Sequence, residues 1–494
     1  MQTFLQRPVI RALLSGVLLG IAFPQVSLGT LGLLVFVAYV PLLLAIIDGG
    51  KAARRWSLIA WFYLTFVVFH GLSNWWVCSW QAQTDPYLFA SGLALWLFHP
   101  FFLMLPFIAL ASIRRRLGIV WMLISTPLSI AGFEWLHGQT DASYPWLTIG
   151  YSLVHTPFAQ VADTVGVYGL SFMIGIVNAL VLYVFLALRQ GARIRTPSVL
   201  LAVFIIAWGA WGLSKSEPPI NGDSISVMLV QPNENPWEKW GDTRAQVDVH
   251  EMLVDSARSS GSKPDMVVWS ETAIPYTIRD PRLEAEWEEL RKWVDTSQIS
   301  LLTGFADVMV YPPGQAPPSA RHSRIDPAVR FDTFNAAMMI NAGVLDVPVH
   351  RKSMLTPFAE RLPFADQLTF AMSWIEWGVG ISAWGKGQTR NPLELVRSGD
   401  TIAHVGTIIC IESIYPEVAR DLFNNGASTM VQTFCALSPM MRGTTAPGDL
   451  SNISILPACE PLNRGGQSLD AQTPGSLASS DRTGPRIRIP LSSQ

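Results

Sequence analysis

The stretch Thr407-Ile-Ile-Cys-Ile-Glu-Ser-Ile-Tyr-Pro416 decides how the second half of the chain is interpreted. A short apolar run with strand character ends at Cys410, and Glu412 follows just behind it. Folds present a nucleophile at the edge of a sheet in this way, with a thiol at the end of a buried strand and a carboxylate nearby. A lone cysteine in such a run can equally be a small core residue, so the interpretation depends on the other strand ends.

Two further strand ends carry charged side chains. Glu271 closes the run Met266–Glu271, and Lys352 follows the run Val347–Arg351. If the three groups meet, the carboxylate takes the thiol proton, the thiolate attacks a carbonyl and the ammonium faces the developing oxyanion. We therefore predict that Glu271, Lys352 and Cys410 form a catalytic set for acyl transfer.

The segments around these residues alternate between strand and helix patterns. Strands are expected at 225–230, 266–269, 300–305, 334–340 and 401–409, and helices at 243–259 and 282–297. This alternation predicts a layered α/β domain rather than a sandwich made of strands alone.

The first half of the chain has the composition of a membrane domain. Of the 494 residues, 50% are hydrophobic and only 15% are charged, whereas soluble domains carry about 25% charged residues. Apolar runs occupy about 9–28, 30–47, 56–74, 87–112, 118–135, 165–188 and 198–213. Each is close to the ~20 residues with which a helix crosses a bilayer, so we predict seven transmembrane helices in residues 1–213.

The basic residues between these runs predict the orientation. They occur at alternate junctions only: Arg7 and Arg11; Lys51, Arg54 and Arg55; Arg114, Arg115 and Arg116; and Arg189, Arg193 and Arg195. Because positively charged loops stay in the cytoplasm, the N-terminus is predicted to be inside. Everything after Leu213 is then expected outside the cytoplasm.

Charge and cysteine content exclude several classes of function. The net charge of −2 leaves no basic excess for nucleic acid. The four cysteines, Cys78, Cys410, Cys435 and Cys459, show neither metal-ligand spacing nor a paired framework. We therefore expect no metal, no cofactor and no nucleic-acid partner.

Several segments resemble one protein superfamily. Val267–Pro275 is similar to the strand around the general base of the nitrilase, or carbon–nitrogen hydrolase, superfamily, whose catalytic set is Glu, Lys and Cys in that order. Lys352-x-x-Leu-x-Pro-Phe-x-Glu360 resembles its lysine motif. Cys410-x-Glu412 resembles its nucleophile motif, although the family often has an aromatic residue in place of Ile411. Gln231–Trp240 resembles its first strand and the Trp-bearing loop behind it.

Together with the apolar first half, where Glu134-Trp135 and Tyr144–Tyr151 also match, the chain resembles the apolipoprotein N-acyltransferase family from about residue 10 to about 432. The resemblance implies a transmembrane helical domain in 1–213. It further implies a nitrilase-like α-β-β-α sandwich in 220–432 that is incomplete at its C-terminal end. The implied location is the bacterial inner membrane, with the catalytic domain on the periplasmic side.

The reaction implied by the resemblance is a two-step acyl transfer. Glu271 would act as base while Cys410 attacks a phospholipid acyl ester, giving a thioester and a lysophospholipid. The amine of the N-terminal cysteine of a diacylglyceryl apolipoprotein would then take the acyl chain, and Lys352 would stabilise both tetrahedral intermediates. Glu360 and Glu412 would orient the lysine and the thiolate.

Four tryptophans are predicted to contact substrate. Trp237 and Trp240 lie in the loop after the first strand, and Trp374 and Trp377 lie in 361–390. That region interleaves aromatic residues with glycines, as a mobile apolar arm that admits acyl chains would, and ordinary packing is the alternative. The predicted partners are the phospholipid donor, the apolipoprotein acceptor and the bilayer, and the protein is expected to be a monomer.

The last part of the chain does not fit this family. From residue 433 it is rich in Gly, Ser, Pro and Arg, and Phe434 is its only aromatic residue. Such a composition cannot bury enough surface to offset the ordering of the backbone, so 433–494 is predicted to be a disordered, low-complexity tail. A shifted reading frame or degraded gene end is the preferred origin, and natural divergence is the alternative.

Two alternatives to the acyltransferase stay open. One is a membrane-tethered amidase or nitrilase-type hydrolase, in which water resolves the thioester. The other is an inactive truncated remnant, because strands missing beside the site would leave the catalytic groups poorly positioned. The membrane helices and the apolar arm favour the acyltransferase, since a soluble amide substrate would need neither.

Overall fold

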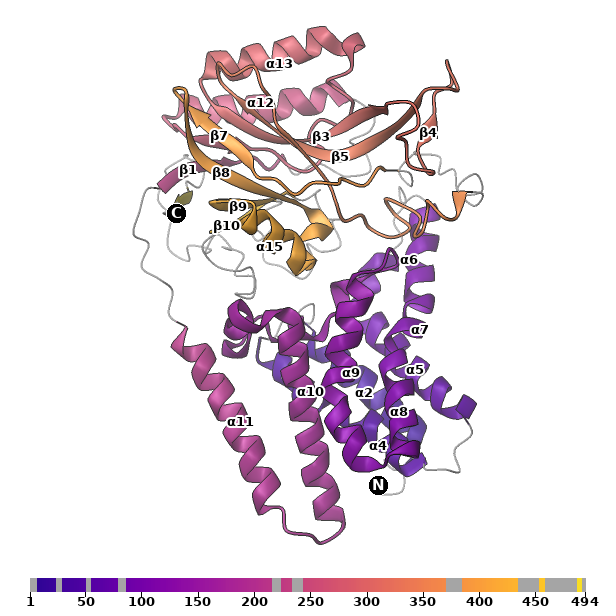
Figure 1. Ribbon diagram of the computed structural model, residues 1–494. Helices are drawn as coiled ribbons and strands as arrows, with labels where there is room; N and C mark the ends of the chain where they lie inside the picture. The colour runs from indigo at the N-terminus through magenta and orange to yellow at the C-terminus, as the bar shows by residue number, and fades with distance from the viewer. Residues whose placement is uncertain are drawn as a thin grey trace. The chain divides into compact units, whose positions relative to one another are not determined.

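The computed structural model describes residues 7–23, 29–49, 55–78, 86–215, 224–232, 243–369, 384–433, 453–457 and 487–490. The chain divides into two compact units (Figure 1). The first is built on Met1–Pro218 and the second on Pro219–Pro461.

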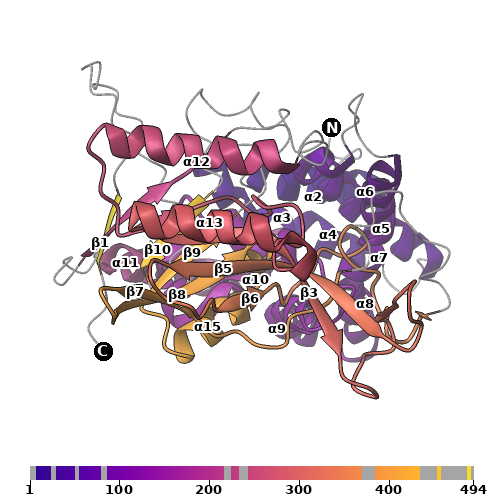
Figure 2. The same ribbon diagram turned by 90° about the horizontal axis from the view of Figure 1, so that it is seen from above.

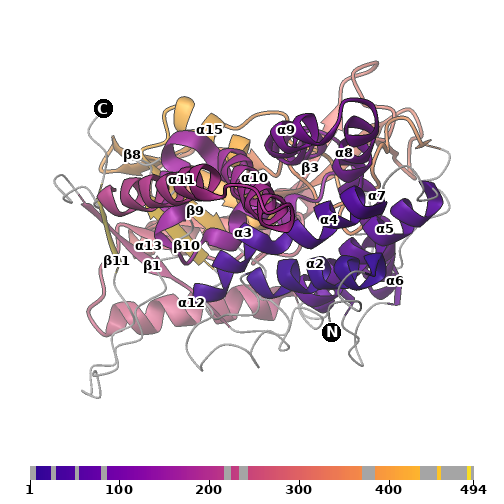
Figure 3. The ribbon, with the colours of Figure 1, turned by 90° about the horizontal axis from the view of Figure 1, so that it is seen from below.

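Within its described residues the first unit is entirely helical (Figure 3). Its α-helices are α2 (Pro8–Ala22), α3 (Val35–Ala38), α4 (Val40–Gly49), α5 (Arg55–Ser73), α6 (Pro86–Phe98), α7 (Pro100–Leu103), α8 (Leu105–Arg116), α9 (Ile119–Gly138), α10 (Ala162–Arg189) and α11 (Arg195–Ser214). The 3₁₀ helices are η2 (Gly29–Leu34), η3 (Trp75–Cys78), η4 (Pro145–Leu147), η5 (Ile149–Leu153) and η6 (Pro157–Val161).

Six helical segments of the described chain are long and apolar enough to span a membrane: Leu31–Gly49, Trp56–Ser73, Phe89–Arg116, Ile119–Gly138, Pro157–Arg189 and Arg195–Ser214. The prediction of seven spans is therefore confirmed for six of them. The first predicted span is shorter than expected, because α2 has only 15 residues. Phe23 turns extended (ψ 147°) at its end, as expected for the residue that precedes a proline, here Pro24.

Three buried histidines meet inside this unit. His70 Nε2 lies 2.7 Å from His99 Nδ1, and His99 Nε2 lies 3.0 Å from His137 Nε2. The backbone N–H of Tyr144 donates to His137 Nε2 at 3.4 Å, so this nitrogen is an acceptor and His99 Nε2 is the donor. His70 Nε2 then donates to His99 Nδ1. One ordered set of tautomers thus satisfies all of these ring nitrogens, as buried polar groups require.

The second unit contains two β-sheets. In the described residues the larger sheet has seven strands, in the order β11-β1-β2-β3-β5-β4 with β6 beside β5, and the smaller has four, in the order β10-β9-β8-β7. Their bounds are β1 (Ser224–Leu229), β2 (Met266–Val268), β3 (Ser300–Tyr311), β4 (Arg321–His322), β5 (Arg330–Asn341), β6 (Val349–Arg351), β7 (Leu393–Arg397), β8 (Asp400–Ile409), β9 (Thr429–Thr433), β10 (Ile453–Pro457) and β11 (Ile487–Pro490).

Helices cover the outer face of each sheet. α12 (Thr243–Ser259) and α13 (Glu284–Ser297) lie on the larger sheet, with the short η7 (Pro281–Leu283) before α13, and α15 (Pro416–Asn424) lies on the smaller sheet (Figures 1 and 2). The layers follow one another as helices, sheet, sheet and helix. This is the predicted α-β-β-α sandwich.

Strand β3 shows how the layers pack. Leu301 faces α12 and α13 and shares a buried core with Val254 and Leu290 of these helices. The next residue, Leu302, belongs to the core between the two sheets, together with Ile409 of β8. Successive side chains of a strand point to opposite faces, and both faces of β3 are covered. This explains why residues 300–307 of this strand are all buried.

Strands β3 and β5 both extend beyond the predicted bounds 300–305 and 334–340. They pair antiparallel from Ser300 opposite Asn341 to Tyr311 opposite Arg330. Most of the extra residues lie next to the loop 312–329 that joins the two strands, and residues 308–311 alternate between exposed and half-buried. Asp307 and Asp332 interrupt the apolar pattern there, which is why the sequence predicts only the half of each strand farther from the loop.

The predicted disordered tail lies mostly outside the described residues. Two short segments of it are described, and each is a strand. β10 pairs antiparallel with β9 of the smaller sheet, and β11 pairs antiparallel with β1 of the larger sheet. At these segments the prediction of disorder is corrected. Addition to the edge of an existing sheet satisfies the backbone of a short segment without a core of its own.

Candidate active site

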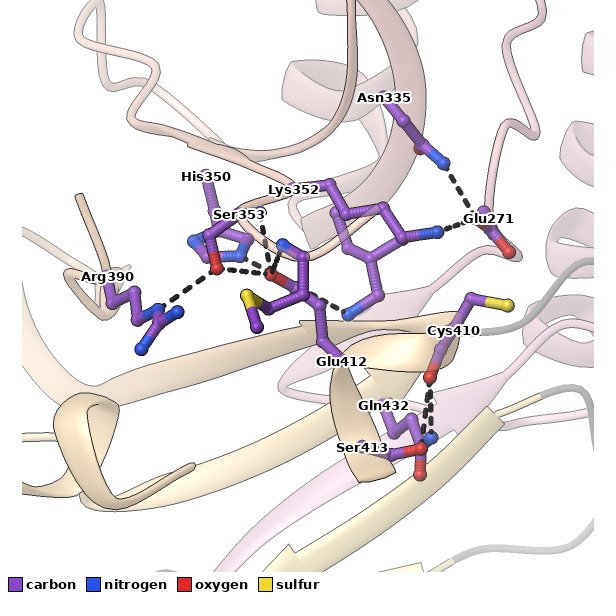
Figure 4. A network of polar contacts seen from close by, with 12 residues as sticks. Glu271, Asn335, His350, Lys352, Ser353, Arg390, Cys410, Glu412, Ser413 and Gln432 are labelled. Atoms are coloured by element: carbon purple, nitrogen blue, oxygen red, sulfur yellow. Dashed lines mark hydrogen bonds and ion pairs between the residues drawn. The ribbon is translucent and has the colours of Figure 1, made fainter. Parts of the chain in front are cut away.

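The three predicted catalytic residues lie just beyond strand ends of the second unit (Figure 4). Glu271 follows β2, Lys352 follows β6 and Cys410 follows β8. Glu271 and Lys352 are buried, with 6% and 1% of their surface exposed, whereas Cys410 is half-buried. The structure therefore brings a carboxylate, an ammonium and a partly accessible thiol into one neighbourhood.

Lys352 is held between two carboxylates. Its Nζ lies 3.2 Å from Glu271 Oε1 and 2.9 Å from Glu360 Oε1. Burial lowers the pKa of Lys352, but the charges of Glu271, Glu360 and the Cys410 thiolate outweigh burial and hold the pKa well above its ordinary value. The side chain is therefore an ammonium at neutral pH. It stands close enough to Cys410 for the two charges to interact.

Sheet pairing sets the positions of Lys352 and Asn335. The backbone N–H of Lys352 donates to Asn335 O at 2.8 Å, where β6 runs beside β5. The side chain of Asn335 donates to Glu271 Oε1 at 2.7 Å and to Glu360 Oε1 at 3.1 Å. Asn335 thus supports both carboxylates that hold the lysine.

Glu271 can approach β3 because residue 304 has no side chain. A Cβ placed on Gly304 would lie 2.8 Å from Glu271 Cα and 2.5 Å from the backbone nitrogen of Thr272. Contacts this short would push the segment away from the sheet, so this close backbone approach requires glycine.

Cys410 occupies a strained backbone position. Its φ of 50° lies in the left-handed region, and the residue turns the chain from β8 into the 3₁₀ helix η8 (Cys410–Ile414). Ser413 Oγ and Gln432 Nε2 donate to the Cys410 carbonyl at 3.0 Å and 3.3 Å. Strain of this kind persists only where the surrounding structure holds it, and it concentrates at functional sites. The turn presents the thiol on a sharp corner, as a nucleophile requires.

The second supporting carboxylate, Glu412, is fully buried and faces the lysine segment. It accepts hydrogen bonds from Ser353 N at 2.7 Å, Ser353 Oγ at 2.7 Å, Ile409 N at 3.0 Å and His350 Nε2 at 3.3 Å. Burial raises the pKa of Glu412, but the hydrogen bond and charge of His350 and the two backbone donors outweigh it and lower the pKa to about 2. Glu412 ties the turn at Cys410 to the segment after β6.

Replacing Glu412 with glutamine should destabilise the protein in a pH-dependent way. The carboxylate pKa falls from 4.5 to about 2 on folding, which corresponds to about 3 kcal/mol of stability at neutral pH. Because the folded-state pKa is depressed, this contribution is present above pH 4.5 and is lost as the pH falls toward 2.

Thermal melting at a series of pH values measures this contribution. E412Q should melt several degrees lower than the unaltered protein at pH 7, and this difference in melting temperature should narrow below pH 4.5. E288Q, at an exposed glutamate of α13, is the matched control. A gap that does not change with pH would contradict this role.

Several polar residues of the site carry no sequence motif. Asn335, His350 and Ser353 contact the glutamates described above, and Arg390 Nε donates to Ser353 Oγ at 3.0 Å. The polar side chain of Asn335 inside the apolar strand 334–340 indicates that it has a buried partner, but the sequence does not indicate which one. His350 lies in the three-residue strand β6, which is too short to give a pattern, and Ser353 and Arg390 lie between regular elements, where polar residues are ordinary.

The predicted substrate-binding residues Trp237, Trp240, Trp374 and Trp377 all lie outside the described residues. In the part of the chain that the structure describes, no group of three or more His, Cys, Asp or Glu side chains is placed to hold a metal ion.

Two family models match the chain. The apolipoprotein N-acyltransferase N-terminal domain matches residues 15–180, and the carbon–nitrogen hydrolase domain matches residues 226–451. The apolipoprotein N-acyltransferase of Chlorobaculum tepidum is 29% identical over 439 residues, which cover 86% of this chain and 78% of the relative. That of Brucella melitensis is 30% identical over 441 residues, covering 83% and 75%. Among solved structures, a carbon–nitrogen hydrolase from Helicobacter pylori covers 43% of this chain and 61% of its own, with 15% identity and a TM-score of 0.28.

Proposed function

Because this chain belongs to the apolipoprotein N-acyltransferase family, we propose that it transfers a fatty acyl chain from a phospholipid to the N-terminal cysteine amine of apolipoproteins. The observation that supports this most strongly is the placement of Lys352 between Glu271 and Glu360, beside Cys410. A base, an oxyanion-stabilising cation and a nucleophile are the groups that acyl transfer through a thioester needs.

In the first step the acyl chain moves to the enzyme. Glu271 takes the proton of the Cys410 thiol, and the sulfur attacks the ester carbonyl of the phospholipid. The ammonium of Lys352 donates to the oxyanion that forms. When the C–O bond breaks, the lysophospholipid leaves with the proton from Glu271, and the acyl chain remains as a thioester.

In the second step the amine replaces the sulfur. The acceptor amine attacks the thioester carbonyl and gives its proton to Glu271, again with Lys352 facing the oxyanion. The C–N bond forms as the C–S bond breaks, and the departing thiolate of Cys410 takes that proton from Glu271. Glu360 and Asn335 keep the lysine in place in both steps.

The membrane helices suit a lipid substrate. In the first unit every second junction is basic, which puts all the basic junctions on the cytoplasmic side, so we place the second unit on the periplasmic side of the inner membrane. An N-terminus in the cytoplasm and a second unit in the periplasm require an odd number of membrane crossings. This proposal therefore counts the short helix α2 as a seventh span. A multi-pass anchor keeps the thiol at the surface where phospholipid and lipoprotein are both available.

The nature of the acceptor separates an acyltransferase from an amidase-like hydrolase. Purified full-length protein in mixed micelles should move a labelled acyl chain from a phospholipid to a diacylglyceryl lipopeptide, giving an amide detected by mass spectrometry. The same lipopeptide with an acetylated amine should receive no label. If the label appears as free fatty acid in both cases and no amide forms, water is the acceptor and the proposal is wrong.

A further inference from the structure

The first unit contains a cleft that the proposed reaction does not use. It lies between α5 and α8 and has a volume of about 400 Å³. Its walls include Leu58, Ile59 and Phe62 of α5 and Ile108, Arg115 and Arg116 of α8. The volume falls within the range of about 300 to 1,000 Å³ that small-molecule sites occupy.

The cleft is apolar inside and basic at its mouth. Leu58 and Phe62 are buried in its wall, whereas Arg115 and Arg116 are exposed in the last turn of α8. The end of a helix that carries basic residues is expected at the level of the lipid headgroups on the cytoplasmic side. An occupant with an apolar chain and an anionic head therefore matches both parts.

Among the described residues of the first unit, no carboxylate is paired with the arginines of this mouth. Within the described residues, none of Arg114, Arg115 and Arg116 forms an ion pair, and the buried Nε of Arg114 has no hydrogen-bond partner. Asp48 is already bound by Arg11 at 2.6 Å and Arg189 at 3.1 Å.

The next acidic residue after α8 in sequence, Glu134, lies toward the far end of the following helix. Glu134 sits in the last turns of the 20-residue helix α9, which begins shortly after Arg116. A helix of that length spans about 30 Å. The positive charge of Arg115 and Arg116 at the mouth is therefore available to an anionic group from outside the chain.

We propose that this cleft binds one anionic phospholipid, with the phosphate on Arg115 and Arg116 and one acyl chain along Leu58, Ile59 and Phe62. Basic pockets between transmembrane helices on the cytoplasmic side hold lipid headgroups by this combination of charge and apolar contact. Free phosphate would leave the apolar wall unfilled. The proposal does not depend on the reaction at Cys410.

Native mass spectrometry of the delipidated full-length protein tests it. Dioleoyl phosphatidylglycerol should bind at one tight site that dioleoyl phosphatidylcholine does not occupy. In the variant R115Q/R116Q the affinity of that site should fall about 30-fold, from a contribution near the surface of about 1 kcal/mol for each arginine. I108W, which fills the cleft and keeps both arginines, should lose the same site.

R193Q is the matched control, because Arg193 is an exposed arginine in a predicted cytoplasmic loop that does not line the cleft. It should bind phosphatidylglycerol as the unaltered protein does. Unchanged melting of R115Q/R116Q without lipid shows that the fold is intact. The proposal is overturned if phosphatidylcholine binds as tightly, if R193Q loses the site as well, if R115Q/R116Q or I108W retains it, or if glycerol 3-phosphate alone competes for it.

Discussion

Replacing Lys352 with methionine should reduce acyl transfer by about 10²- to 10³-fold, the loss that follows removal of one oxyanion donor. Methionine has a similar length and no charge, so the variant fills the same space. The ammonium lies 3.2 Å from Glu271 and 2.9 Å from Glu360, and both carboxylates depend on it. The initial rate of amide formation at saturating donor and acceptor measures the loss.

The same substitution should also destabilise the second unit, because it leaves the buried carboxylate of Glu271 and the half-buried carboxylate of Glu360 without their cation. Breaking a buried pair by removal of one partner typically costs about 3 to 5 kcal/mol. The double variant K352M/E360Q separates the two effects: it removes one of the repelling charges and should recover part of the melting temperature, but none of the activity. K263M, at an exposed lysine before β2, is the matched control and should behave as the unaltered protein.

This prediction fails if K352M retains activity within a few-fold, or if K352M/E360Q recovers activity together with stability. Either outcome would mean that Lys352 serves the fold alone and that another group faces the oxyanion.

Replacing Cys410 with serine should abolish transfer, with a loss of about 10⁴-fold or more, as is typical when the nucleophile of a covalent mechanism is removed. Serine is nearly isosteric, so the turn at φ 50° and its hydrogen bonds should survive. A hydroxyl is a much weaker acid than a thiol, however, and Glu271 cannot deprotonate it to the same extent. The melting temperature should stay close to that of the unaltered protein.

Cys78 provides the matched control for this experiment. It is a free, half-buried thiol of the first unit and is not part of the described site. C78S should transfer acyl chains at the normal rate. Equal losses in C78S and C410S would point to general thiol chemistry rather than to a placed nucleophile.

Chain order and strand ends were sufficient to predict that Glu271, Lys352 and Cys410 lie in one neighbourhood, because each residue stands where an apolar run stops. Glu271 ends a buried strand before Pro275, and Cys410 ends another before Pro416. Both lie beside Lys352 in the structure. The helices 243–259 and 282–297 were equally clear, since their apolar faces repeat with helical spacing.

Other features depend on tertiary pairing and could not be predicted in this way. Asn335 reaches Glu271 and Glu360 only because β5 pairs with β6 in one particular register. The hydrogen bonds of Glu412 to Ser353 likewise join segments that are distant in sequence. The short strands β10 and β11 could not be predicted for another reason. Pairing at the edge of a sheet uses backbone groups, so it leaves almost no signal in the amino-acid composition.

The central claim is that the acyl chain passes through a covalent bond to Cys410, and one measurement addresses it directly. The full-length protein is incubated with phospholipid and no acceptor, digested at low pH, and the peptide containing Cys410 is weighed by mass spectrometry. A mass increase of one acyl group, released by hydroxylamine, strongly reduced in E271Q and absent in C410S, is the predicted result. Amide formation by the complete system without any acylated Cys410 peptide, or undiminished transfer by C410S, would contradict the account.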